Sequence, residues 1–308
     1  MEISDELIEE FGKAIQPVRS AQFKSFSDEV SFIEATIAAL DNIRIEVDAN
    51  GGQSLWTITK QMHLTPRVEF FWPIAWEKTQ AELADLLFIV SVYEDQIEPV
   101  KRRTVLSQSK FTRRPKVRYS PRFSWKIAPH QYYLLEELPA FRVVQPKLKP
   151  VYQLDSIQDS LSTYSFASDS WLPFFQTTSD MRDPVEYDRR NRTDMTYKRQ
   201  SHPGGMLSMF GYLKEFARAN RGQPIERYNS IYSFYSDLFS SNVSFRGETS
   251  GRTVPDGGYR ATDFGMPGYL DRLTSNERKP FGIIQIVVYD DGLPTSDEFF
   301  PDDPLYLG

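Results

Sequence analysis

Cysteine is absent from the 308 residues, and histidine occurs only three times, at His63, His130 and His202. The chain therefore has no disulfide and no thiolate metal site, and its composition disfavours a histidine-rich zinc site. A metal ion bound by this chain is expected to have carboxylate ligands, which hard cations such as Mg²⁺ or Mn²⁺ prefer. The lack of cysteine is also typical of a cytoplasmic protein.

Long apolar runs are missing as well. No stretch reaches the roughly eighteen consecutive apolar residues of a membrane span, so the sequence predicts no transmembrane helix. The acidic N-terminal segment MEISDELIEEFGKAI is unlike a signal peptide. With 40% hydrophobic and 25% charged residues, the composition is that of an ordinary globular protein. We therefore expect a cytoplasmic protein without a membrane partner.

The order of the predicted elements indicates a mixed α/β protein. Helices are expected over 3–15 and 27–41, the second with Ser27 as its N-cap, and short strands follow them. Residues 76–93 are predicted as a turn or helical end that runs into a buried strand. A further strand is expected at 102–111, and a helix that begins near Pro129 follows it. We predict that residues 1–155 form an α/β core with a mixed β-sheet flanked by helices.

The C-terminal half, residues 156–308, is predicted as an α+β extension packed on that core. Its stretch FGIIQIVVYDD, at 281–291, is strongly apolar and predicts a central rather than an edge strand. We see no catalytic signature in this half. We therefore expect it to serve substrate choice, formation of a homodimer or contact with a partner protein.

Positive charge is concentrated in one segment of a chain whose formal net charge is −6. The segment Lys101–Lys126 contains ten basic residues and no acidic one. Such a stretch predicts contact with a polyanion, although it also suits an ordinary solvated loop. The residues expected to bind phosphates are Arg113, Arg114, Lys116 and Arg118. The aromatic residues interleaved with these charges, expected to stack on bases or sugars, are Phe111, Tyr119, Phe123 and Trp125.

A second pattern places polar side chains at the ends of two successive strands. Asp85 precedes the apolar stretch at 86–93, and Gln108 and Lys110 share one face near the end of the next strand. In an antiparallel hairpin the start of one strand meets the end of the other, so Asp85 and Lys110 are expected at the same end. Glu82 lies three residues before Asp85. Alternatively, the two carboxylates lie on a solvated helix face, and Gln108 and Lys110 on the wet face of an edge strand.

Two carboxylates, an amide and a lysine suit the hydrolysis of a phosphodiester bond. The carboxylates can hold a divalent cation that activates water. The lysine can orient the water, help to deprotonate it, or neutralise developing charge.

The pattern of Asp85, then Gln108-Ser109-Lys110, then a helix bearing Gln131 and Tyr133 resembles the PD-(D/E)XK nuclease superfamily. Members with glutamine in the last motif are known, and the resemblance covers roughly residues 27–155. It implies a restriction-endonuclease-like core, Mg²⁺ or Mn²⁺ as cofactor, and DNA as partner, with Gln131 and Tyr133 on the nucleic-acid side.

The resemblance also implies roles for the site residues. Asp85 is the main metal ligand with Glu82 assisting, Lys110 acts on the water, and Gln108 orients the water or fills the outer shell of the metal. Because Gln108 brings no charge, Glu82 or an upstream helix glutamate such as Glu34 would supply it.

We therefore expect a metal-dependent DNA endonuclease, with RNA as the other candidate substrate, of the restriction, repair or anti-phage defence type. The main alternative is a catalytically inactive nuclease-like subunit that binds nucleic acid or a partner protein. A third is an assembly protein whose basic segment meets an acidic partner.

Overall fold

The computed structural model of the protein is a mixed α/β fold. It describes residues 2–16, 26–48, 52–62, 65–94, 99–113, 124–154, 161–168, 173–178, 181, 185–187, 195–198, 207–226, 229–241, 281–290 and 305. The helices are α1 (Asp5–Ala14), α3 (Glu29–Leu40), α4 (Pro129–Glu137), α5 (Met209–Ala217) and α6 (Ser230–Ser240). No helix in these ranges is long and apolar enough to span a membrane.

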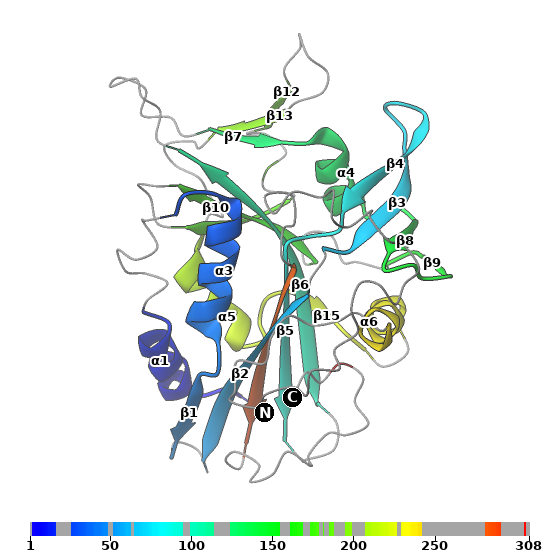
Figure 1. The fold of residues 1–308 in the computed structure, drawn as a ribbon. Helices are drawn as coiled ribbons and strands as arrows, with labels where there is room; N and C mark the ends of the chain where they lie inside the picture. The colour runs from blue at the N-terminus through cyan, green and yellow to red at the C-terminus, as the bar shows by residue number, and fades with distance from the viewer. Residues whose placement is uncertain are drawn as a thin grey trace, which may run out of the picture.

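The centre of the fold is a nine-stranded mixed sheet (Figure 1). Its strands, in spatial order, are β1 (Arg44–Val47), β2 (Gln53–Met62), β16 (Phe281–Tyr289), β5 (Leu86–Tyr93), β6 (Lys101–Thr112), β10 (Ser162–Ser168), β11 (Phe174–Thr177) and β14 (Leu207–Ser208), with β15 (Gln223–Pro224) paired to β6. The β16–β5 and β6–β10 pairs are parallel, and the other pairs are antiparallel. Strands from both sides of residue 155, the predicted boundary, thus share one sheet.

Strand β16 lies between β2 and β5, which confirms the prediction of a central strand. Its side chains are buried on both faces of the sheet: Ile283 and Val287 contact one core, and Ile284 and Ile286 contact the other. Strands of this kind are apolar throughout because neither face meets water. Gly282 provides the room that α3 needs above the strand, since a Cβ there would lie 2.6 Å from Cδ1 of Ile37.

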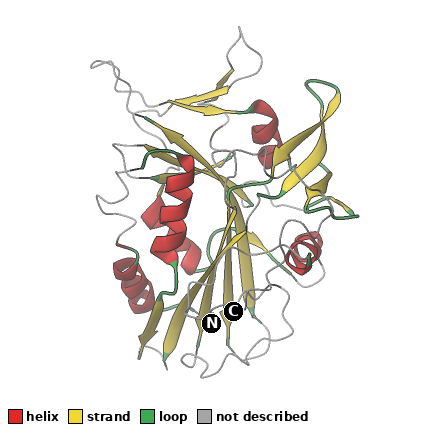
Figure 2. Ribbon diagram, viewed as in Figure 1, coloured by secondary structure: helices red, strands yellow, loops and turns green. Residues whose placement is uncertain are grey.

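Helices cover both faces of the large sheet (Figure 2). Helices α1, α3 and α5 pack on one face through residues such as Phe11, Phe32 and Phe216. Helices α4 and α6 pack on the other through Leu134 and Phe234. The α4 face also carries a four-stranded sheet with the order β4 (Glu77–Glu82), β3 (Arg67–Trp72), β8 (Phe141–Gln145) and β9 (Val151–Tyr152). A three-stranded sheet has the order β12 (Val185–Tyr187), β13 (Met195–Lys198) and β7 (Ser124–Ile127).

Two local predictions are wrong. The N-cap of α3 is Asp28 rather than Ser27: the Asp28 carboxylate accepts a hydrogen bond from the backbone N–H of Ser31 at 2.8 Å, and Ser27 donates to that carboxylate. Residues 77–82, whose composition favours a helix, form strand β4. Pairing with the aromatic strand β3 overrides the weak local preference.

Candidate active site

The pairing of β5 with β6 brings the predicted site residues to one end of the sheet. The two strands are antiparallel, and Leu86 at the start of β5 lies opposite Ser107. Strand β6 continues past that point to Thr112. The Asp85 side chain therefore lies beside the continuing part of β6, where Gln108 and Lys110 follow. This confirms the geometric part of the prediction.

Asp85 is fully buried and held by both neighbouring strands. Its backbone N–H donates to the Ser107 carbonyl at 3.1 Å, and its own carbonyl accepts from the N–H of Gly282 in β16 at 2.9 Å. Its carboxylate oxygen Oδ2 accepts hydrogen bonds from the Gln108 amide and from the backbone N–H of Ser109, the latter at 2.7 Å. The interpretation of Asp85 as a solvated helix residue is thus wrong, because Asp85 precedes a central strand.

Helix α4 adds Gln131 to this group. The helix begins at Pro129, whose fixed φ and missing N–H suit the first helical position. Gln131 donates from Nε2 to Oε1 of Gln108 at 2.6 Å and to the backbone carbonyl of Glu82 at 3.5 Å. Three side chains from β6, α4 and the start of β5 thus form one chain of hydrogen bonds, Gln131 to Gln108 to Asp85. We call it the Asp85 network.

The side chains of Gln108 and Gln131 are both buried, which the interpretations drawn from sequence do not anticipate. Gln108 is fully buried in a central strand, so it is not on the wet face of an edge strand. Gln131 is 7% exposed and points into the Asp85 network. Its side chain therefore orients Gln108 in this structure.

Lys110 has a partner that sequence analysis missed. Its Nζ lies 3.4 Å from Oε1 of Glu29, in the first turn of α3, and the two side chains are only 12% and 19% exposed. Glu34, the helix glutamate suggested from sequence, is exposed instead. An acidic residue in the first turn is a general helix signal, so nothing local in the sequence marked Glu29 as the partner of Lys110.

Tyr164 on β10 is a second neighbour that the sequence did not reveal. It is the parallel-ladder partner of Gln108, so its ring lies on the same face beside the Gln108 side chain. Burial, with smaller contributions from Tyr132, Asp85 and Glu29, holds the pKa of its hydroxyl well above the usual value of 10.0. Tyr164 is therefore a neutral O–H group next to the Asp85 network.

The side chains at this end of the sheet offer oxygen ligands. Among the residues that the structure describes, no group of three or more His, Cys, Asp and Glu side chains is arranged to hold a metal ion. The oxygens present are those of the Asp85 and Glu29 carboxylates and the Gln108 amide, with Glu82 three residues before Asp85. In kind, these donors fit a hard cation such as Mg²⁺ and not a soft one.

The basic segment divides into structural and surface residues. Arg102 is buried and donates to Ser91 and Tyr93, and Arg103 donates to the Gly222 carbonyl at 2.7 Å. Arg113 is exposed beside the start of α3, where it donates to the Ser27 carbonyl. Arg114, Lys116, Arg118, Tyr119 and Phe123 lie outside the described residues.

Trp125 does not present a stacking surface. Its ring is 1% exposed and packs against Phe166 and Phe174, and its Nε1 donates to the Ala167 carbonyl at 2.9 Å. The prediction that Trp125 stacks on bases is therefore wrong. The tryptophan lies in a basic segment of the sequence, but its ring forms part of a hydrophobic core and is shielded from solvent.

Helix α4 also holds the β3–β4 hairpin through two aromatic contacts. The Tyr133 ring stacks on Phe70 with centroids 6.3 Å apart, and the His130 and Trp72 rings meet edge to face with centroids 5.9 Å apart. Tyr133, predicted to face nucleic acid, thus packs on the hairpin.

Burial lowers the pKa of His130 below its ordinary value of 6.5. The unfolded chain then binds more protons than the folded protein between the lowered pKa and 6.5. Stability is therefore complete above about pH 6.5 and falls as the pH drops toward the folded pKa. We expect His130→Phe, which keeps a ring against Trp72, to lose less stability than the wild type between pH 7.5 and pH 5. Urea unfolding at both values measures this, and an identical loss in both proteins would contradict it.

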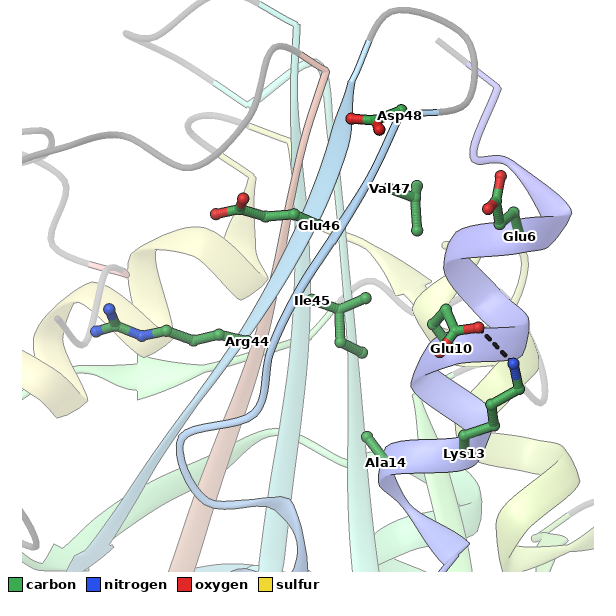
Figure 3. Close-up of a pocket in the computed structure, with 9 residues that line it drawn as sticks. All are labelled: Glu6, Glu10, Lys13, Ala14, Arg44, Ile45, Glu46, Val47 and Asp48. Carbon is green, nitrogen blue, oxygen red and sulfur yellow. Dashed lines mark hydrogen bonds and ion pairs between the residues drawn. The ribbon is translucent and has the colours of Figure 1, made fainter.

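A cavity of about 620 Å³ lies elsewhere, between α1 and β1 (Figure 3). The charged side chains around it are Glu6, Glu10, Lys13, Arg44, Glu46 and Asp48. Lys13 pairs with Glu10, and the Arg44 guanidinium lies over the Trp56 ring. Acidic groups outnumber basic ones there, which disfavours a phosphate ligand. None of the predicted site residues lines it.

Comparison of the chain with protein-family models, with curated proteins and with solved structures finds no match. The candidate function therefore rests on the residues of the site and their contacts.

Proposed function

We propose that the protein is a metal-dependent nuclease that hydrolyses phosphodiester bonds in DNA. The observation that carries the proposal is the Asp85 network, in which a buried carboxylate and two amides are joined by hydrogen bonds. Lys110 lies two residues beyond Gln108 on β6, at the same end of the strand pair, and its ammonium group pairs with Glu29. Isolated polar residues of a solvated surface do not converge in this way. A cluster of buried polar side chains lowers stability unless each side chain is hydrogen-bonded, so its presence indicates a function.

The order of elements around the site supports a restriction-endonuclease-like core as part of the proposal. Helix α3 is followed by β1 and β2, the β3–β4 hairpin, the antiparallel β5 and β6, and then β7 and α4. After β8 and β9 the chain enters β10, which is parallel to β6. This is the helix, strand-pair and helix order on which the resemblance rests. Two features depart from it: strand β16 is inserted between β2 and β5 in the sheet, and the strands of the four-stranded sheet interrupt the order along the chain.

Each residue would have a distinct task. Asp85, with Glu82 or Glu29 as the second carboxylate, would hold Mg²⁺ or Mn²⁺, and the ion would polarise a bound water and the scissile phosphate. Lys110 would hold the charge of the phosphate through Nζ or orient the attacking water. Gln108, fixed by Gln131, would direct its amide toward that water.

The basic surface would supply binding strength. Arg113, and beyond the described residues Arg114, Lys116 and Arg118, would contact backbone phosphates next to the strand end that carries Lys110. Such contacts make affinity fall steeply with added salt. A cytoplasmic role in restriction or antiviral defence, and contact with a second copy or a partner protein through the C-terminal half, complete the proposal.

One observation favours a second candidate, a catalytically inactive nuclease-like subunit that binds nucleic acid. Oδ2 of Asp85 already accepts two N–H groups, and Lys110 already faces Glu29. These contacts hold Oδ2 of Asp85 and Nζ of Lys110 in place without a cation. The two candidates share the fold and the DNA contacts, and they differ only in whether the bond is cut.

The test is cleavage of supercoiled plasmid by the purified protein with Mg²⁺ or Mn²⁺. We expect cleavage that EDTA abolishes and that Lys110→Ala slows by about a hundredfold or more, because general acid–base and charge-stabilising groups contribute about that much. Lys13→Ala, an exposed lysine on α1, is the matched control and should cleave normally. Salt-sensitive DNA binding without cleavage under any metal would instead support the inactive subunit. Cleavage that Lys110→Ala leaves intact would refute the site.

A further inference from the structure

The turn of the β3–β4 hairpin presents three large apolar side chains to solvent. Phe71, Ile74 and Trp76 are 46%, 59% and 81% exposed, and among the described residues only Val100 and Val151 are large, apolar and comparably exposed. The Phe71 and Trp76 rings meet edge to face at 5.9 Å. We call these three residues the hairpin tip. Scattered exposed apolar residues are ordinary, but a cluster of this kind marks a contact surface.

Trp76 adopts an unusual backbone conformation for its size. Its φ is +54°, in the left-handed region that glycine and asparagine favour in turns and that large side chains seldom adopt. A glycine would fit this turn at lower cost. A strained and exposed tryptophan is better explained by a contact made with its indole ring than by stability of the turn.

The hairpin is fixed to the candidate site through helix α4. Side chains alternate along β3, so Phe70 and Trp72 face α4 while Phe71 faces the other way, toward Trp76. The α4 residues that hold them, Tyr133 and His130, flank the Gln131 position that bonds to Gln108. Strand β4 ends at Glu82, whose carbonyl also accepts from Gln131. Figure 1 shows the hairpin projecting beside α4.

We propose that the hairpin tip stacks on, or inserts between, bases of the DNA bound at the Asp85 network. The inference rests on the proposed function. Aromatic rings can stack on a nucleic acid of any sequence, because every base has a π face. Apolar side chains such as Phe and Ile can insert between base pairs and unstack them. Fixed through α4, the tip would set which phosphate next to the disturbed step reaches Asp85 and Lys110.

The composition of the tip favours a nucleic acid over a protein surface. Three side chains on one turn fall far short of the about 20–30 residues a side that a stable protein interface uses. One stacked or inserted base, by contrast, needs only one or two rings. The hairpin tip is thus suited to contact a single base of a DNA chain that the protein binds mainly through the basic segment and the candidate active site.

The experiment separates binding from cleavage. A DNA duplex that carries 2-aminopurine, whose fluorescence rises when the base unstacks, is titrated with Lys110→Ala protein in Ca²⁺. We expect the fluorescence to rise. The double variant that also carries Trp76→Ala should show no rise and a Kd about tenfold higher, which corresponds to about 1.4 kcal/mol. Trp76→Phe should restore most of the effect. Val151→Ala, which truncates a 60% exposed apolar side chain on β9 of the same four-stranded sheet, is the control and should change neither value.

Other outcomes are decisive as well. If the wild type cleaves plasmid and Trp76→Ala cleaves and binds as Val151→Ala does, the inference fails while the proposed function stands. A Trp76→Ala protein that binds DNA normally but sediments as a smaller oligomer would overturn the inference in favour of a protein interface. If the protein neither binds nor cleaves DNA or RNA, both fail. Binding that depends on Trp76 in a protein that never cleaves supports the inference and refutes catalysis.

Discussion

Replacement of Asp85 by alanine is expected to abolish DNA cleavage and to lower the free energy of unfolding by about 2–4 kcal/mol. The Asp85 carboxylate accepts from the Gln108 amide and the Ser109 N–H, and all three residues are fully buried. Truncation leaves two buried donors unsatisfied, each costing about 1–3 kcal/mol, and removal of a buried charge offsets part of that. Domains are stable by only about 5–15 kcal/mol, so the loss is large.

Asp85→Asn separates the structural from the chemical role. An asparagine Oδ1 placed where Oδ2 now lies can still accept both hydrogen bonds, but the side chain carries no charge. We therefore expect a smaller loss of stability in urea unfolding than for Asp85→Ala, together with loss of plasmid cleavage. Wild-type cleavage by Asp85→Asn would show that the carboxylate charge is not used. An Asp85→Ala protein as stable as the wild type would show that the network contributes little to the fold.

Replacement of Ile286 by aspartate is expected to prevent folding. Ile286 is fully buried in β16, opposite Val90 of β5 and Thr57 of β2, and it packs in the core beneath α1, α3 and α5. The described side chains that form this core are apolar, so a carboxylate placed there would be unpaired. Burial of an unpaired charge costs on the order of the whole stability of a domain.

The controls for this variant are Val100→Asp and Ile286→Val. Val100 is 55% exposed, so a charge there should change stability little. Ile286→Val removes one methyl group and should cost about 0.5–1.5 kcal/mol. Circular dichroism and thermal melting of the three proteins give the comparison. A cooperative melt of Ile286→Asp within a few degrees of the wild type would contradict the central position of β16.

Local signals in the sequence predicted the parts of the site that are close in the chain. Asp85 before an apolar strand, and Gln108 and Lys110 two residues apart on the next, were enough to place the three at one end of a hairpin. Pro129 marked the start of the helix that carries Gln131. In these cases the spacing of side chains within one element determines which of them can meet.

The rest depended on contacts between distant segments. Glu29 meets Lys110 across 81 positions, and Tyr164 lies beside Gln108 only because β10 pairs in parallel with β6. Nothing in the composition of 77–82 opposes a helix, and only pairing with β3 makes it a strand. The burial of Trp125 and Arg102 could not be predicted for the same reason, because the side chains that surround them in the core are not their neighbours in sequence.

The place of β16 has a consequence for how the protein is made. The strand that follows Asp85 pairs on one side with β6 and on the other with residues 282–289. A ribosome delivers residues 282–289 well after Asp85, Lys110 and Gln131. Until then the backbone of Asp85 lacks the Gly282 N–H that it bonds in the finished fold. The environment of Asp85 is therefore completed only after residues 282–289 have been synthesised and have paired with β5.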